Sequence, residues 1–185
     1  FFDNNPLQKI TNSLEKFDFV PVLEKEICAI RKLFKENMSN IINEEMINSN
    51  FMTCMPKIKS GILLYKTSED LADPLIFHEK CNEKGATIIL IKLEDGHIFG
   101  GFNPLSWINE FMYNNTSESF IFSITDGKYR LPMKCPIKKG MRKYAIKQNK
   151  NEYSPGFGET DKADLFLAFK NLKNSYSNLG NVYKC

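Results

Sequence analysis

Few residues of this chain could take part in nucleophilic, redox or metal chemistry, because it contains two histidines and five cysteines. His78 and Cys81 are three residues apart, a spacing that places both on one face of a helix. Such an H-x-x-C pair supplies half of a four-ligand zinc site, but His97 and the other cysteines stand alone in the sequence. The sequence therefore favours a small core thiol at Cys81, with His78 capping or bordering the helix.

The alternative at Cys81 is a reactive thiol, which would make the protein a redox-reactive enzyme. A thiol becomes reactive when a nearby cation or a helix N-terminus lowers its pKa. Cys81 comes late in its predicted helix, where the helix dipole disfavours a thiolate. The sequence also lacks a G-x-S-x-G elbow, a Gly-rich phosphate loop and an EF-hand loop. We therefore expect a non-enzymatic protein with no cofactor and no bound metal.

The cysteines are dispersed and odd in number, with no C-x-x-C pair. They are Cys28, Cys54, Cys81, Cys135 and Cys185. This usage predicts free thiols in a reducing compartment, the cytoplasm, and not a disulfide framework.

The strongest charge feature is a run of seven cations without an acid between residues 134 and 150. They are Lys134, Lys138, Lys139, Arg142, Lys143, Lys147 and Lys150, and Tyr129, Tyr144 and Tyr153 lie among or beside them. The run is interpreted first as a solvated face and second as a surface for an acidic protein partner. Anionic lipid or nucleic acid is a further alternative, but nucleic acid is disfavoured because no nucleic-acid fold motif accompanies the cations.

The composition describes one globular domain. The chain has 185 residues, 42% of them hydrophobic and 25% charged, which excludes a disordered or collagen-like protein. No apolar run approaches the roughly 20 residues of a membrane span. The charge is uneven, since residues 1–56 hold 6 cations and 8 acids, whereas residues 57–185 hold 19 and 14. The pattern of apolar and polar residues also changes there, from helical spacing to short strands and turns, which predicts a domain boundary near residue 56.

The first part, residues 1–56, is predicted to be an N-terminal helical arm that begins at Pro21. A seam of residues on one face of this helix recurs at intervals of three and four, and all of them but one are apolar. The seam is Leu23, Ile27, Ile30, Phe34, Asn37 and Ile41. The helix, residues 22–47, is expected to dock on its own domain, and self-association through it is the alternative.

The second part, residues 57–185, has the texture of strands and turns. Asp73-Pro74 and Gly85 predict a helix over residues 74–84, after a short strand at 62–65. Two Asp-Gly turns predict hairpins that pair residues 87–93 with 97–102 and residues 120–125 with 128–133. Gly100-Gly101 indicates a bulge or a close approach of another backbone. These elements predict an α+β, mostly β fold: a two-sheet antiparallel β-sandwich with short flanking helices.

Several fragments of this second part resemble the TLDc domain, in the same order along the chain. They are LLYKTSED at 63–70, FHEKC at 77–81, DGHIFGGF at 95–102, FIFSI at 120–124, YSPGFG at 153–158 and SYSNLG at 175–180. The resemblance covers residues 57–183, and the combination of FHEKC, IFGGF and SYSNLG is specific.

The resemblance implies a two-sheet sandwich bordered by short helices, as in proteins related to the oxidation resistance and nuclear receptor coactivator families. It implies an interaction module and not an enzyme, with a role in protection against oxidative stress or in regulation of the vacuolar proton pump through its peripheral sector. Family members continue beyond the Asn-Leu-Gly motif with a further strand or two. Residues 57–185 are therefore expected to form a TLDc-like domain whose last strands are either absent or lie beyond Cys185.

Overall fold

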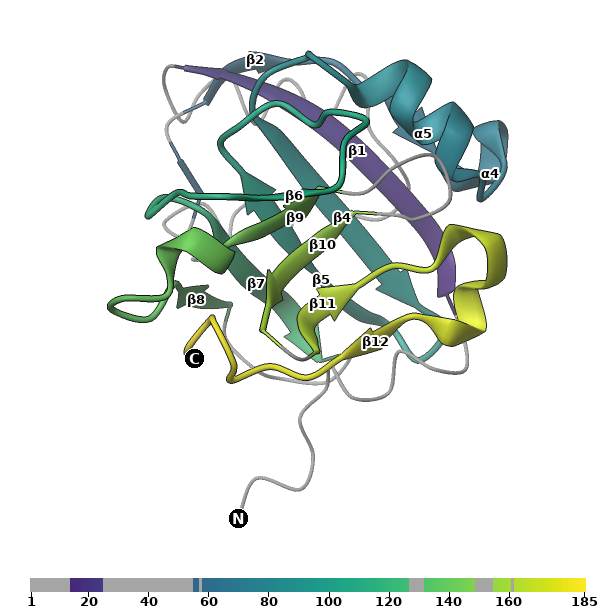
Figure 1. Cartoon of the computed structure of the whole chain (residues 1–185). Helices are drawn as coiled ribbons and strands as arrows, with labels where there is room; N and C mark the ends of the chain where they lie inside the picture. Colours follow the sequence, from purple (N-terminus) through teal and green to yellow (C-terminus); the bar gives the residue numbers. More distant parts are fainter. Residues whose placement is uncertain (1–13, 25–54, 57, 127–131, 149–154, 161) are drawn as a thin grey trace.

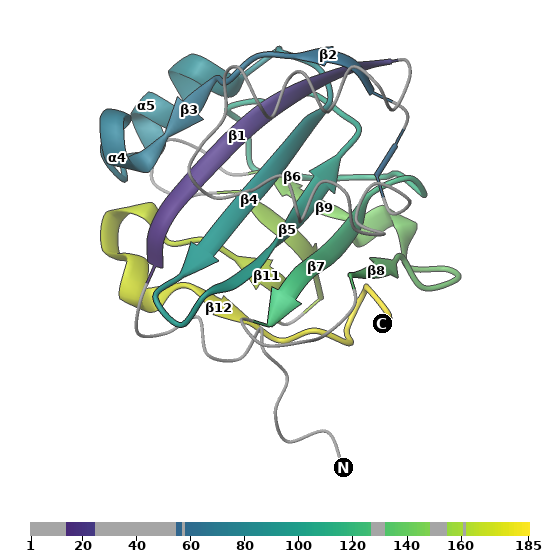
Figure 2. The same ribbon diagram turned by 180° about the vertical axis from the view of Figure 1, so that it is seen from behind.

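The computed structural model of the chain describes residues 14–24, 55–56, 58–126, 132–148, 155–160 and 162–185. Two antiparallel sheets form two layers. Figure 1 looks onto the five-stranded sheet, and Figure 2 shows the seven-stranded sheet from the other side. The predicted mostly β sandwich with short flanking helices is confirmed.

The seven-stranded sheet has the order β2-β1-β4-β5-β7-β8, and β3 also pairs with β1. Its strands are β1 (Leu14–Glu24), β2 (Ile58–Gly61), β3 (Tyr65–Lys66), β4 (Thr87–Leu93), β5 (His97–Asn103), β7 (Phe120–Asp126) and β8 (Met133–Pro136). The five-stranded sheet has the order β12-β11-β10-β9-β6. Its strands are β6 (Met112–Asn114), β9 (Ile146–Gln148), β10 (Gly156–Glu159), β11 (Ala163–Phe166) and β12 (Tyr176–Ser177).

Short helical segments border the sheets in the described part of the chain. They are α4 (Thr67–Asp70), α5 (Pro74–Cys81) and the 3-10 segments η2 (Arg142–Tyr144) and η3 (Phe169–Asn174). The predicted helix after Asp73 is confirmed as α5, and the Asp73 carboxylate accepts a 2.7 Å hydrogen bond from the backbone N–H of Leu75. The helix ends at Cys81, three residues before the predicted end. Asn82 is extended and the Glu83 N–H donates to the Trp107 carbonyl, which draws the chain toward the loop before β6.

The first predicted hairpin is confirmed as β4 and β5. Every β4 residue except Lys92 is buried, as expected for a strand inside a sandwich. Gly96 adopts a φ of 87°, a left-handed turn conformation that favours glycine. The second predicted hairpin is confirmed only in part. β7 pairs antiparallel with β8, but β8 begins at Met133, the last residue of the strand predicted at 128–133, and Met133 pairs with Ser123. Most of their connection lies outside the described residues.

Gly100 and Gly101 let two pieces of backbone and one aromatic ring come close, so the predicted close approach is confirmed. A Cβ on Gly100 would overlap the carbonyl oxygen of Ile89 on β4. A Cβ on Gly101 would lie 2.5 Å from the ring of Phe157, which reaches across from the five-stranded sheet. The missing side chains therefore set how closely the two sheets pack.

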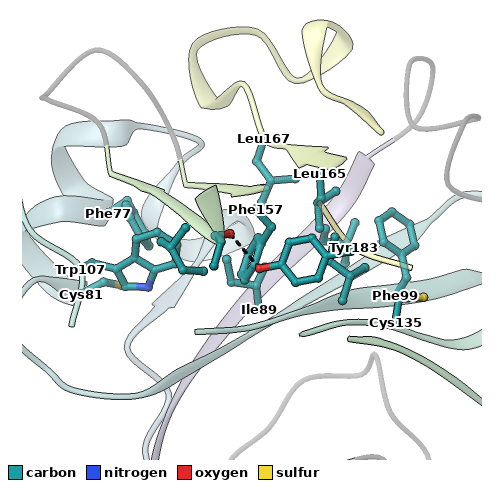
Figure 3. Close-up of a cluster of buried hydrophobic side chains, with 14 of the residues drawn as sticks. Phe77, Cys81, Ile89, Phe99, Trp107, Cys135, Phe157, Leu165, Leu167 and Tyr183 are labelled. Atoms are coloured by element: carbon teal, nitrogen blue, oxygen red, sulfur yellow. Dashed lines mark hydrogen bonds between the residues drawn. The ribbon is translucent and has the colours of Figure 1, made fainter. Parts of the chain in front are cut away.

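The core between the layers is rich in aromatic rings (Figure 3). Phe77 of α5 contacts the rings of Tyr65, Trp107 and Phe169 edge-to-face, with centroids 5.6–5.8 Å apart. The Trp107 indole N–H donates a 2.7 Å hydrogen bond to the Thr87 hydroxyl, so its polar atom is satisfied inside the core. These contacts fasten α5 and the loop before β6 to the sandwich.

Two sequence predictions of secondary structure are wrong. Residues 62–64 are not strand, and β2 and β3 flank them, so the short strand predicted at 62–65 is displaced. The helix predicted to begin at Pro21 does not begin there, because β1 runs through Pro21 to Glu24 and pairs with β4 and β2. Long-range pairing overrides the local pattern at both places. The rest of the predicted helix, residues 25–47, lies outside the described residues.

The prediction that the cysteines are free thiols is also wrong in part. Cys135 and Cys185 form a disulfide, with their Cα atoms 4.3 Å apart. Cys81 is a free, buried thiol, and Cys28 and Cys54 lie outside the described residues. The two joined cysteines are 50 residues apart in sequence and meet because an isolated bridge pairs Ile137 with Tyr183 beside them. Their dispersed positions in the sequence carry no sign of this long-range contact.

Candidate functional site

The predicted basic run connects the two sheets. Lys134 lies on β8, Lys138 and Lys139 come after it, Arg142 and Lys143 form most of η2, and Lys147 lies on β9. The seventh cation, Lys150, lies outside the described residues. The run therefore crosses from the end of one sheet to the next-to-last strand of the other.

Three of the cations are engaged within the molecule. The Lys147 ammonium group lies 2.5 Å from the Glu159 carboxylate, and both side chains are largely buried. Lys138 donates a hydrogen bond to the carbonyl oxygen of Gly180. The Lys134 ammonium group lies 3.9 Å from the centre of the Phe120 ring. Each of these three contacts joins the basic run to a segment distant in sequence.

Lys139, Arg142 and Lys143 remain exposed on the turn that contains η2. Backbone hydrogen bonds fix this turn, because Tyr144 N–H donates to Met141 and Ala145 N–H donates to Arg142, at 3.0 and 3.2 Å. The Arg142 carbonyl also accepts a 3.1 Å bond from the Thr116 N–H, just after β6. The exposed cations are thus presented on an ordered turn next to β6.

Aromatic side chains of β6 and the residue before it lie beside this turn, and sequence reasoning missed them. Phe111 and Tyr113 are 62% and 37% exposed. Tyr113 contacts Tyr144 of η2 edge-to-face with ring centres 6.0 Å apart, and the Phe111 ring centre lies 6.4 Å from that of Tyr113. Of the tyrosines noted near the basic run, Tyr129 and Tyr153 lie outside the described residues. We call Phe111, Tyr113, Arg142, Lys143 and Tyr144 the aromatic–basic patch.

The sequence held a partial signal for this patch. Phe111-Met112-Tyr113 is an apolar group without helical or strand periodicity, between Glu110 and Asn114. An apolar triplet in a polar loop is a candidate contact surface, but nothing in the sequence places it beside residue 142. The antiparallel pairing of β6 with β9 makes that connection.

Cys81 lies in the core and not at a reactive surface. Its side chain is fully buried, and burial raises the pKa of the thiol well above its ordinary value. His78 is also buried, and its Nδ1 lies 3.0 Å from Oδ1 of Asn82, the residue that ends the helix. The predicted core thiol bordered by a histidine agrees with this geometry. The geometry disfavours the alternative in which Cys81 meets an oxidant.

A buried carboxylate joins the last motifs of the chain to the sandwich. Asp164 of β11 accepts backbone N–H bonds from Gly180, Asn181 and Val182 at 2.7, 2.9 and 2.8 Å. Burial raises the pKa of Asp164, although these N–H donors act in the opposite direction. A Cβ on Gly158 would overlap the same carboxylate. The GFG and Asn-Leu-Gly fragments therefore meet at Asp164, where they support the fold.

Tyr183 completes this junction between the sheets (Figure 3). Its hydroxyl donates a 2.7 Å hydrogen bond to the carbonyl oxygen of Ala145 and lies 2.7 Å from the Ser119 hydroxyl. The Ser119 hydroxyl in turn donates to the Phe102 carbonyl at 2.7 Å. The network thus links both layers to the C-terminal segment, residues 180–185. It has the character of a structural network, because the acceptors are backbone groups.

Metal-ligand clusters and membrane-spanning helices are both absent from the part of the chain that the structure describes. Within these residues, no group of three or more His, Cys, Asp or Glu side chains is arranged to hold a metal ion. No helix among them is long and apolar enough to cross a membrane.

The two-sheet fold and the clustered motifs agree with a comparison of the sequence with protein families. A family model of the TLDc domain matches residues 35–185, more than half of the chain, so the chain belongs to the TLDc domain family. Among individual proteins, MTOR-associated protein MEAK7 of Danio rerio is 39% identical over 44 residues, or 24% of this chain. The match spans about 10% of that relative's length.

Proposed function

We propose that this chain is a non-enzymatic TLDc interaction module that binds a protein partner. The single observation that carries the proposal is the family match over residues 35–185. The described residues support it, because the family's motif residues are used to build the sandwich and the exposed aromatic and basic side chains gather elsewhere, beside β6. Such residue types are typical of protein interfaces.

The proposed role is regulation of the vacuolar proton pump through its peripheral sector, or protection against oxidative stress, as the family resemblance implies. The name of the Danio rerio relative associates that protein with MTOR, which is a second candidate partner to test. A cytoplasmic location is part of the proposal. The division of the chain at residue 56, and self-association through residues 22–47, stay predictions.

Binding to the purified peripheral sector of the pump tests this role. The chain is immobilised, and the purified sector is passed over it in an interferometry experiment with a β-sandwich protein of similar charge as control. We expect saturable binding to the chain and none to the control. The absence of binding, with the chain shown to be folded by circular dichroism, contradicts the pump role.

A second measurement addresses the oxidative-stress role. Cells that lack the gene product are exposed to peroxide with and without the reintroduced chain, and survival is scored. The module hypothesis predicts that Cys81→Ala rescues as well as the wild-type chain, because the Cys81 thiol is buried. Loss of rescue in Cys81→Ala, with normal folding, would favour the redox-enzyme alternative instead.

A further inference from the structure

Strand β6 ends the five-stranded sheet. It pairs on one side with β9, through Met112–Gln148, Tyr113–Lys147 and Asn114–Ile146. On its other side, no strand within the described part of the chain pairs with it. A sheet edge of this kind presents backbone N–H and C=O groups that an extended segment of another chain can use.

Several side chains around this edge lie on the outer face of the sheet. Ile146 and Gln148 of β9 are buried toward the core, so Lys147 and its cross-strand neighbour Tyr113 lie on the outer face. The centre of the Phe111 ring lies 5.6 Å from the Lys147 ammonium group, on the same face. Tyr113 therefore packs between Phe111 and Tyr144 in a fixed arrangement, with much of the Phe111 and Tyr113 rings still exposed to solvent.

Two cations beside the edge are exposed on the turn that contains η2. Among the described residues, no carboxylate pairs with Arg142 or Lys143, whereas Lys147 on the next strand is paired with Glu159. The Lys143 ammonium group lies 4.7 Å from the centre of the Tyr144 ring, which orients it without neutralising it. The edge thus combines exposed aromatic rings with the exposed cations Arg142 and Lys143, which are complementary to carboxylates of a partner.

We propose that an acidic, extended segment of a partner protein adds to the free edge of β6 and places carboxylates against Arg142 and Lys143. The segment pairs its backbone with β6 and lays alternate side chains over Phe111 and Tyr113. The inference rests on the proposed function, since it names the face and the partner chemistry of that same interaction module. Aromatic residues and Arg are the residue types that dominate binding energy at protein interfaces.

An anionic membrane is the competing class of partner, and the geometry favours it less. Binding at a membrane surface typically buries the apolar face of an amphipathic helix among the headgroups. Here the Tyr113 ring is packed edge-to-face against Tyr144 on the face of a sheet, and little more than a third of its surface is exposed. The patch is therefore better shaped for a strand lying across it than for insertion.

The test uses a fluorescent ten-residue peptide that alternates valine and glutamate, titrated into the whole chain and followed by fluorescence anisotropy. We expect saturable binding that weakens as salt is added, because exposed charges are screened. A peptide that alternates valine and lysine should not bind. Methylation of the backbone nitrogens along one edge of the acidic peptide should abolish binding, since it removes the strand-pairing donors.

Variants then locate the site. The double variant R142E/K143E should weaken binding by at least about tenfold, and Phe111→Ser by about fivefold. Both alter exposed side chains, so the fold should persist. R142Q/K143Q provides a milder version should charge reversal disturb the turn. The matched controls are Lys173→Glu in η3, next to β12 at the far end of the sheet, and Leu75→Ser, an exposed apolar residue of α5.

The outcomes separate this inference from the proposed function. Peptide binding that is absent, or equal in wild type, R142E/K143E and Phe111→Ser, overturns the inference. Binding to phosphatidylserine-containing vesicles that depends on Arg142 and Lys143, without peptide binding, overturns it in favour of a membrane. If the purified pump sector binds and R142E/K143E has no effect on it, the proposed function stands and this site is wrong. If the peptide binds but the sector does not, the pump role fails and the site stands.

Discussion

The C-terminal segment and strand β6 both lie at the margin of a sheet, yet their polar groups are used in opposite ways. Three backbone N–H groups of the C-terminal segment, residues 180–185, end on one buried carboxylate, and Cys185 is covalently joined to β8. Beside β6, the cations of η2 and the aromatic rings face solvent. The difference separates residues that hold the sandwich together from residues available to a partner.

This comparison corrects a simple interpretation of the basic run. A sequence of seven cations looks uniform, but Lys138 and Lys147 bind the Gly180 carbonyl and the Glu159 carboxylate, whereas Arg142 and Lys143 have no carboxylate partner among the described residues. Charge density along a sequence is therefore a poor guide to a binding surface, since the partners of each charge are set by the fold. Only the part of the run without carboxylate partners among the described residues contributes to the aromatic–basic patch.

The largest expected effect comes from removing the Asp164 carboxylate, which binds the C-terminal segment to the sandwich. Asp164→Ala removes the acceptor of three backbone N–H groups, one of them the buried N–H of Val182, and should lower the free energy of unfolding by about 3–5 kcal/mol. Urea denaturation measures the loss. Arg142→Glu, the matched change beside β6, should leave the free energy of unfolding within about 0.5 kcal/mol of the wild-type value. Equal losses of unfolding free energy in Asp164→Ala and Arg142→Glu would contradict the distinction between the C-terminal segment, which stabilises the fold, and the exposed side chains beside β6.

The second prediction concerns the covalent bond of the same segment. Cys185→Ser removes a disulfide that closes a 50-residue separation and should cost about 2–4 kcal/mol, largely by freeing the unfolded chain. Thermal unfolding with and without dithiothreitol measures it, because reduction should bring the wild type to the level of the variant. A wild type that is insensitive to dithiothreitol would show that the bond does not contribute. Peptide binding at β6 should persist below the melting temperature.

The third prediction concerns the buried thiol of Cys81, which contrasts with the exposed aromatic–basic patch. Cys81→Ser places a hydroxyl in an apolar site and should cost about 1–3 kcal/mol, whereas Cys81→Ala should cost less. The rates of peroxide consumption by wild type and both variants should be equal, because the thiol is buried and protonated. A slower rate in both variants would place chemistry in the interior and weaken the comparison.

The smallest expected effect sharpens the contrast between paired and unpaired surface charge. The Asp70 carboxylate lies 2.5 Å from the Lys80 ammonium group and accepts a 2.8 Å bond from the Lys66 N–H. Burial alone would raise the pKa of Asp70, but these two donors hold it below its ordinary value of 3.8. The stabilisation is thus present above that value and is lost as the pH falls through the lower pKa of the folded state.

Asp70→Asn tests this sign. At neutral pH the variant should lose less than about 1 kcal/mol, because water screens the pair. Urea titrations between neutral and strongly acidic pH should show the difference from wild type shrinking toward zero. A stability difference between Asp70→Asn and wild type that grows as the pH falls would contradict a lowered pKa for Asp70. Lys143→Gln, whose cation lacks a carboxylate partner among the described residues, should show no such dependence.

Much of the fold could be predicted because its signals are local. Asp73 caps α5 through an N–H two residues away, and Asp95-Gly96 turns β4 into β5. The TLDc fragments, taken in their order along the chain, also indicate the family that the family model confirms. Each of these signals depends on residues close in sequence, whose backbone preferences survive in almost any tertiary setting.

The candidate site could be predicted only in part. The cations are visible in the sequence, but Phe111 and Tyr113 become part of the site only when β6 pairs with β9. The same holds for β1, where pairing with β4 replaces a predicted helix start, and for Cys135, which finds its partner at the end of the chain.

The sequence alone determined the family, the two-layer mostly β architecture, the capped helix and the first hairpin. The tertiary structure alone decided which of the described cations are paired, which aromatic rings lie beside Arg142 and Lys143, and which cysteines are joined. The physical reason is that turns and caps are held by hydrogen bonds over a few residues. Charge pairing, ring packing and disulfide formation require side chains that only strand pairing brings within a few ångströms of one another.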